Sequence, residues 1–333
     1  MLGIQYFNFI RSAAMIAVMS LTSPGHAEPV ILRIDSPLGP DHSSSKAMET
    51  FRTELVHRTK GAVDAVVSTE MKGGSPKELI DGVRTGAVFA FPCPVPYFSR
   101  LVPEIDALGL PFVLPDANHA HRAVDGAAGK LIEARLIEKG FVPLAWMALG
   151  SRHVTNSKRP LRTLDDFKGL RIRVQPSEIY MASFRALGAN PVAMDFANVY
   201  TALKQGDIDA QETPYYPIYS AKFYEVQKYL SDTGHVFDLI VFVASKKALA
   251  DLPPDQQKAV TDAARIAAAQ EWKMAAAVDE TAFATLKANG MQFDPVPSAT
   301  RAAFKKAMSG VIDGARQRIG AELVDQIVAA GRR

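Results

Sequence analysis

The histidines and the cysteine are the side chains best suited to metal binding or covalent catalysis, and their spacing favours neither. Only His119 and His121 lie close together, and on the helix that we expect there, residues two positions apart do not share a face. Cys93 is the single cysteine, which excludes an internal disulfide, and no neighbouring residue would lower its pKa. We therefore predict neither a metal site nor a cysteine nucleophile.

The sequence also lacks the short motifs that mark the common enzyme and cofactor sites. It contains no G-x-S-x-G, no G-x-x-x-x-G-K-[ST], no G-x-G-x-x-G and no H-E-x-x-H. We expect no cofactor and no catalytic residue. Once these enzyme and cofactor sites are excluded, we predict that the function is recognition of a ligand. Proteins of the α/β class bind ligands outside the carboxyl ends of their strands.

Composition and charge narrow the class of protein further. The chain has 333 residues, of which 48% are hydrophobic, and this length is typical of about two domains, each with its own core. The 38 Lys and Arg against 35 Asp and Glu give a net charge of +3, which does not indicate a nucleic-acid-binding surface. No apolar run reaches the roughly 18–20 residues that span a bilayer.

The N-terminus has the pattern of an export signal. Arg11 precedes a short apolar stretch, and Gly25, His26 and Ala27 place small side chains at the −3 and −1 positions that a signal peptidase requires. We predict that residues 1–27 are a signal peptide cleaved between Ala27 and Glu28, and that the mature protein is periplasmic.

Two α/β units follow the signal. Strands are expected at 30–34, 62–68 and 88–91, with helices at 45–60 and from Pro76 to near Gly86, where Ser75 and Glu78 form a capping box. The same order returns as strands at 171–174, 192–194 and 208–211, with helices at 177–187 and 197–205. A crossover between the units is expected at about 144–155.

The C-terminal part is predicted to be helical. From Pro253 and Pro254 no helix breaker occurs before Asn289-Gly290. Some 36 residues at about 1.5 Å each would span about 54 Å, more than one small domain. We expect this helix to cross both units.

Four segments then identify a family resemblance. The stretch FANVYTALKQGDIDAQE at 196–212 resembles the F-x-E-V-Y-x-A-L-x-x-G-x-V-D-G-Q-E-N pattern of the solute-binding subunits of TRAP transporters, the DctP family. In addition, LDDFKGLRIRV at 164–174 resembles its D-x-K-G-L-K-I-R-V, and ALGANP at 186–191 its G-A-x-P turn. Pro103-Glu104 with LPF at 110–112 resembles its P-E…L-P-F run.

The resemblance implies an α/β, two-lobed fold like that of periplasmic binding proteins, with a mixed or parallel sheet flanked by helices in each lobe. One long helix would span both lobes. We assign residues 28–149 and about 239–278 to the first lobe, and 150–238 and about 279–333 to the second, with the ligand cleft between them. The implied function is capture of a small organic acid anion by a monomeric protein and its delivery to the small and large TRAP membrane subunits.

The resemblance also implies the binding residues. The family's most persistent ligand contact is the arginine of I-R-V, here Arg173, whose planar guanidinium suits a carboxylate. From chemistry alone Arg171 competes for this role, because it points to the same face of the strand. Arg152 matches a second arginine of some members. Thr213 stands where the family usually has Asn, and Glu212 is expected to bind or to orient the arginines.

Three further residues complete the predicted site. Phe196 and Tyr216 belong to an aromatic cluster around the 196–212 motif, and we expect them to line an apolar wall of the pocket. Cys93 aligns with a strand end that faces the cleft in relatives, where it would make the wall less polar.

Two other functions remain alternatives at this point. One is a sensor subunit that reports the ligand to a signalling partner. The other is an exported hydrolase or lyase with His153 or Glu212 as base. The sequence leaves open whether the ligand is a dicarboxylate, a keto or hydroxy acid, a sugar acid or an aromatic acid.

Overall fold

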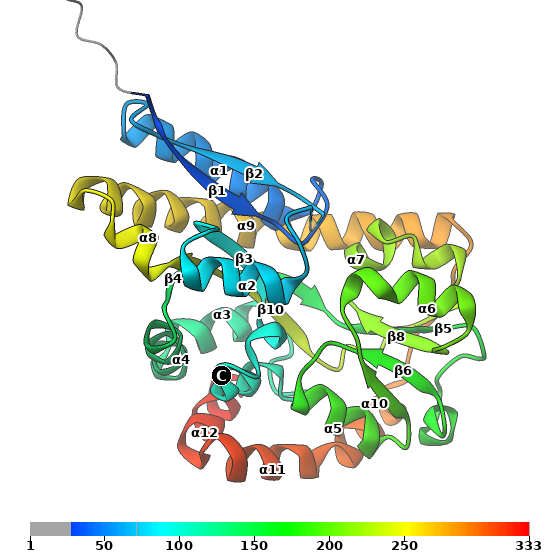
Figure 1. Ribbon diagram of the computed structural model, residues 1–333. Coiled ribbons are helices and arrows are strands. Elements are labelled where there is room, and N and C mark those ends of the chain that lie inside the picture. The colour runs from blue at the N-terminus through cyan, green and yellow to red at the C-terminus, as the bar shows by residue number, and fades with distance from the viewer. Residues whose placement is uncertain (1–27, 71, 333) are drawn as a thin grey trace, which may run out of the picture.

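The chain folds into two lobes, each built on one mixed β-sheet covered by helices (Figure 1). The computed structural model describes residues 28–70 and 72–332. The predicted signal peptide, residues 1–27, and its cleavage site lie outside the described residues, apart from Glu28. The two-lobed α/β architecture is the predicted one.

The first lobe contains a five-stranded sheet in the order β2-β1-β3-β10-β4. Its elements are β1 (Val30–Asp35), α1 (Ser43–Arg58), β2 (Val63–Ser68), α2 (Pro76–Thr85), β3 (Ala90–Pro94), β4 (Phe141–Ser151), β10 (Phe237–Ser245) and α8 (Lys246–Ala250). The helices α3 (Ala117–Asp125) and α4 (Ala127–Glu138) and the short turns η1 (Val95–Phe98) and η2 (Pro103–Gly109) complete it. The predicted capping box of α2 is confirmed, and Gly86 ends the helix with φ 89°.

The third predicted strand was misplaced. It was expected to end at Phe91, before the prolines, but β3 runs through Pro92 and Pro94. A proline cannot donate to a sheet ladder. On the edge that faces β1, β3 pairs only at Ala90, so neither proline needs to donate a hydrogen bond there. β10 pairs along the other edge of β3.

The second lobe contains a six-stranded sheet in the order β11-β9-β5-β8-β6-β7. Its elements are β5 (His153–Asn156), η3 (Leu164–Phe167), β6 (Arg171–Val174), α5 (Glu178–Ala186), β7 (Asn190–Ala193), η4 (Phe196–Asn198), α6 (Val199–Gln205), β8 (Ala210–Thr213), α7 (Tyr215–Ser220), η5 (Phe223–Glu225), β9 (Tyr229–Ser231) and β11 (Gln292–Asp294). The predicted helix at 197–205 is divided into η4 and α6.

Two chain crossings and a long helix join the lobes. β4 leads through Arg152 into β5, and the chain returns from β9 to β10, with the backbone N–H of Arg152 donating to the carbonyl of Val236 at 2.8 Å. Helix α9 (Pro254–Ala288) packs on α1 and β4 of the first lobe and on α7 of the second (Figure 1). The predicted domain-spanning helix is therefore confirmed.

The C-terminal helices differ from the predicted lobe assignment. They are α10 (Ser298–Ala307), α11 (Ser309–Ile319) and α12 (Ala321–Ala330). Residues 279–333 were assigned to the second lobe, but α12 packs against α3, α4 and η2 of the first (Figure 1). The reason is its apolar face of Leu323, Val324 and Ile327, which is buried there. None of the described helices is both long enough and apolar enough to cross a membrane.

Helix α9 carries a buried carboxyl group at Glu271. Its Oε1 accepts from the Ser43 hydroxyl at 2.6 Å, and its Oε2 accepts from the backbone N–H of Ala148 at 2.9 Å. Burial raises the pKa of Glu271 to about 7, although these two hydrogen bonds favour the ionised form. Because the folded-state pKa lies above the unfolded value of 4.5, Glu271 keeps its proton in the native protein between these two pH values, whereas the unfolded chain has lost it.

We expect the free energy of unfolding to fall as pH rises from about 4.5 to 7 through this group, by on the order of 3 kcal/mol. The variant Glu271→Gln mimics the protonated form, so it should be more stable than the wild type at pH 8 and nearly equal at pH 4. Urea unfolding across this pH range measures the effect. Glu280→Gln, an exposed position of the same helix, is the control, and an equal change in both variants would contradict the prediction.

Candidate ligand-binding site

The carboxyl ends of strands from both lobes meet at a small cavity of about 20 Å³. Its walls are Pro37, Leu38, Pro94, Tyr97 and Leu149 from the first lobe and Gln175, Phe196, Thr213 and Pro217 from the second. Most of these residues follow or end β1, β3, β6, β7 and β8, whereas Leu149 lies near the end of β4 and Pro217 lies in α7. This is the place in an α/β fold where strand order and loop geometry leave a crevice for a ligand.

Arg173 lies directly beside this cavity with its positive charge unpaired. It is fully buried on β6, and its Nε donates to the carbonyl of Met194 at 2.9 Å. Its Nη2 lies 3.5 Å from the hydroxyl of Tyr97, and its Cζ lies 5.7 Å from the ring centre of Phe196. Nη1 has no hydrogen-bond partner, and no carboxylate of the described residues lies within 4.0 Å of the guanidinium.

The electrostatics of Arg173 follow from this burial. Desolvation lowers the pKa of the guanidinium, and the partial compensation comes from Tyr97 and Glu212. An arginine still remains charged near neutral pH, because its ordinary pKa lies far above neutral. A buried cation with a free N–H and no counter-ion is an arrangement that an anion stabilises.

Arg173 and Arg171 lie in different environments. Arg171 stands at the amino end of β6, half exposed and away from the cavity. Its Nε and Nη2 donate to the two carboxylate oxygens of Asp209 at 3.0 and 2.9 Å. A paired surface arginine offers nothing to a ligand in the cleft, so the geometry favours Arg173.

Arg152 is also fully buried, but its charge is paired twice. Nε and Nη2 donate to the carboxylate of Glu212 at 2.5 and 2.8 Å, Nη2 also to the Glu212 carbonyl at 2.7 Å, and Nη1 to Asp238 at 2.5 Å. These contacts link the two chain crossings between the lobes, which together form the hinge. A direct contact of Arg152 with the ligand stays a prediction.

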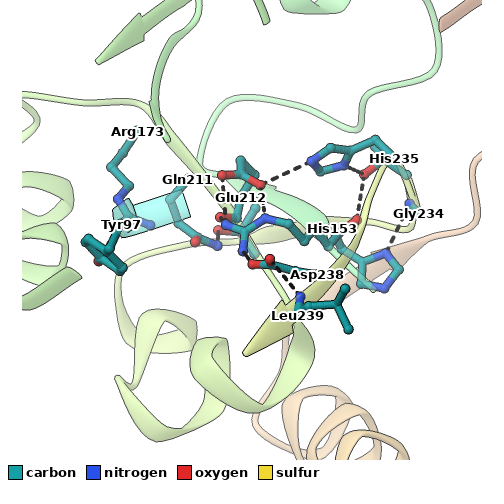
Figure 2. Close-up of polar contacts among 12 residues, drawn as sticks. Tyr97, His153, Arg173, Gln211, Glu212, Gly234, His235, Asp238 and Leu239 are labelled. Carbon is teal, nitrogen blue, oxygen red and sulfur yellow. Dashed lines mark hydrogen bonds and ion pairs between the residues drawn. The ribbon is translucent and has the colours of Figure 1, made fainter. Parts of the chain in front are cut away.

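The two carboxyl groups that pair with Arg152 have different pKa values. Burial opposes ionisation of Glu212, but Arg152 and the contact with His235 outweigh it and lower its pKa to about 2. Burial raises the pKa of Asp238 to about 6 despite Arg152. His235 lies 3.1 Å from Glu212, and burial lowers its pKa, so the imidazole is neutral near pH 7 (Figure 2). Glu212 thus pairs directly with Arg152, and both of its predicted roles stay predictions.

The other predicted site residues occupy three different places. Phe196 and Thr213 line the cavity. Cys93 is fully buried one residue before Pro94, which forms the wall, and burial raises the pKa of its thiol. Tyr216 lines a separate groove of about 540 Å³ along α9, and its ring contacts His42 of the first lobe at 4.8 Å. Ligand contacts by these four residues stay predictions.

Sequence reasoning missed Tyr97, Gln175, His235 and Asp238. Tyr97 and Gln175 follow the carboxyl ends of β3 and β6, so the rule for strand ends could have found them. Asp238 was visible as the one acid within the apolar strand at 237–245. His235 had no comparable signal.

The fold and the site define a class of protein. Two α/β lobes on a hinge, with an unpaired buried arginine in the cleft between them, are the design of a solute-binding protein. The sequence model described as DctP, bacterial extracellular solute-binding protein, family 7, matches residues 36–318. The chain belongs to this family, as predicted, and the proteins of the family are binding proteins rather than enzymes.

Individual relatives are similar over nearly their whole length. The 2,3-diketo-L-gulonate-binding periplasmic protein YiaO of Escherichia coli (strain K12) is 33% identical over 93% of this chain and 92% of its own. The C4-dicarboxylate-binding periplasmic protein DctP of Rhodobacter capsulatus is 29% identical over 94% of each chain. The sugar acid binding protein DctPAm of Advenella mimigardefordensis, solved with galactonate, superposes with a TM-score of 0.89 at 28% identity, covering 92% of this chain and 99% of that one.

Proposed function

We propose that this protein captures a small organic acid anion in the periplasm and delivers it to the membrane subunits of a TRAP transporter. The observation that carries the proposal is the buried guanidinium of Arg173, whose Nη1 has no partner. A ligand carboxylate would pair with it bidentately. The relatives support this chemistry, since their names include a diketo sugar acid, C4-dicarboxylates and galactonate.

Binding requires the lobes to move. A cavity of about 20 Å³ is far smaller than the roughly 300 Å³ or more of a typical ligand pocket. Tyr97 belongs to the first lobe and Arg173 to the second, so parting of the lobes at the hinge uncovers the guanidinium. The lobes then close on the anion, and the contacts made only in the closed state supply the free energy of closure.

The proposal has three further parts, which rest on the family resemblance and, for the signal peptide, on the sequence pattern at Gly25–Ala27. The small and large membrane subunits supply the path across the membrane, the signal peptide is cleaved between Ala27 and Glu28, and the mature protein acts as a monomer. The family relationship supports transport over the alternative of a sensor subunit.

A thermal-shift screen of the mature protein against organic acids tests the proposal. A ligand that binds only the folded state raises the unfolding midpoint, with a stabilisation of about 2.7 kcal/mol at one hundred times Kd. We expect a rise with at least one carboxylic acid and no chemical change in the recovered ligand. Absence of a shift with every acid, or turnover of a bound acid, would contradict the proposal.

A further inference from the structure

We infer that the ligand is a monocarboxylate with a mainly apolar body, in which one further polar group, a hydroxyl or a keto oxygen, lies next to the carboxylate. This inference rests on the proposed function and narrows its ligand. It separates this chain from binders of dicarboxylates and of polyhydroxylated sugar acids. Three features of the cleft carry it: its charge, its lining and the position of its polar groups.

The charge of the cleft suits one carboxylate. Among the described residues, the cavity walls contain no lysine, arginine or histidine, and Arg173 beside them is the one cation there without a carboxylate partner. Arg152 is paired with both Glu212 and Asp238, so this trio has no positive charge to offer. The second carboxylate of a dicarboxylate would be buried without a cation, which weakens binding by roughly a hundredfold or more.

The lining is too apolar for a sugar acid. Of the nine wall residues, only Tyr97, Gln175 and Thr213 have polar side chains. The three prolines of the wall, Pro37, Pro94 and Pro217, also lack backbone N–H donors. Each ligand hydroxyl buried there without a partner weakens binding about tenfold. A branched aliphatic or aromatic body instead gains from contact with Leu38, Leu149 and Phe196.

The polar groups lie on the side of Arg173. Gln175 lies two residues after Arg173, directly beyond the end of β6. Its Oε1 is buried without a hydrogen-bond partner. Tyr97 already contacts Arg173, and Thr213 ends the neighbouring strand β8. The side-chain amide of Gln175 accepts from a hydroxyl in one orientation and donates to a keto oxygen in the other. The ligand's extra oxygen therefore belongs beside its carboxylate.

Isothermal titration calorimetry of the mature protein tests the inference with probes that vary the second carboxylate, the number of hydroxyls and the apolar body. The apolar probes are 2-hydroxy-4-methylpentanoate, 3-phenyllactate and their 2-keto counterparts. Succinate adds a second carboxylate, glucuronate and erythronate add hydroxyls, and glycolate removes the body. We expect an apolar probe to bind at least about thirtyfold more tightly than succinate, either sugar acid or glycolate. Because every probe is a carboxylate, Arg173→Gln should weaken binding of the apolar probes by about thirtyfold or more.

The outcomes separate this inference from the proposed function. If succinate or a sugar acid binds as tightly as the best apolar probe, and Arg173→Gln weakens it, the ligand class is wrong and the organic-acid function stands. If no carboxylate of any kind binds the wild type, both are wrong. Tight binding of the apolar amide 4-methylpentanamide, equal to that of the acids, would also overturn both, because it would leave Arg173 without a role.

Discussion

Arg173→Gln is expected to weaken binding of the cognate acid by about thirtyfold or more. Loss of one partner from a buried, hydrogen-bonded charge pair costs about 2–5 kcal/mol. Arg173 is the partner concerned, because it is fully buried and its Nη1 is free. Glutamine retains hydrogen-bonding groups and removes the charge, so the effect reports the ion pair. Calorimetry at one salt concentration measures it.

The matched control is Arg171→Gln, two residues earlier on the same strand. Arg171 is half exposed and paired with Asp209, so its replacement should leave the affinity unchanged. A second readout separates binding from folding. Since Arg173→Gln removes a buried charge that has no counter-ion in the ligand-free protein, the unfolding midpoint without ligand should be unchanged or higher. A weaker affinity that arises only with a lowered midpoint would contradict the assignment.

Arg152→Met is expected to destabilise the protein by about 3–5 kcal/mol, the cost of breaking a buried ion pair from one side. The variant leaves the carboxylates of Glu212 and Asp238 facing each other without a cation, at 0% and 1% side-chain exposure. Part of this cost is relieved when Asp238 is protonated, because burial already raises its pKa to about 6. The loss of stability should therefore be smaller at pH 5 than at pH 8.

Urea unfolding at both pH values measures this loss. Arg52→Met is the matched control, since Arg52 makes the same bidentate contact with Asp64 at 2.8 and 2.9 Å but on the surface. Its unfolding midpoint should stay close to that of the wild type. Equal destabilisation by the two variants would mean that burial of the Arg152 network adds nothing.

Most elements could be predicted because their signals are local. The capping box of Ser75 and Glu78, the glycine that ends α2 and the uninterrupted run of α9 each depend on residues a few positions apart. The strand β3 was misplaced for a related reason. Proline was taken as a strand end, but the sequence does not reveal that β1 pairs with β3 at a single residue.

The site was predictable only in part. The family resemblance pointed to Arg173, but spacing left Arg171 as a competitor, since both occupy one face of a strand. Asp209 decides between them, 38 residues away in the sequence. Likewise Tyr97 approaches Arg173 from 76 residues away, and it belongs to the other lobe.

The sequence by itself determined the α/β class, the two units, the domain-spanning helix and the family. These depend on hydrophobic periodicity, caps and motifs, which are properties of neighbouring residues. Only the tertiary structure decided which arginine is free and which is neutralised. Arg152 receives its counter-charges from Glu212 and Asp238, 60 and 86 residues along the chain, whereas no described carboxylate contacts Arg173. The free energy of a buried charge depends on what folding places beside it, and a linear pattern does not encode that.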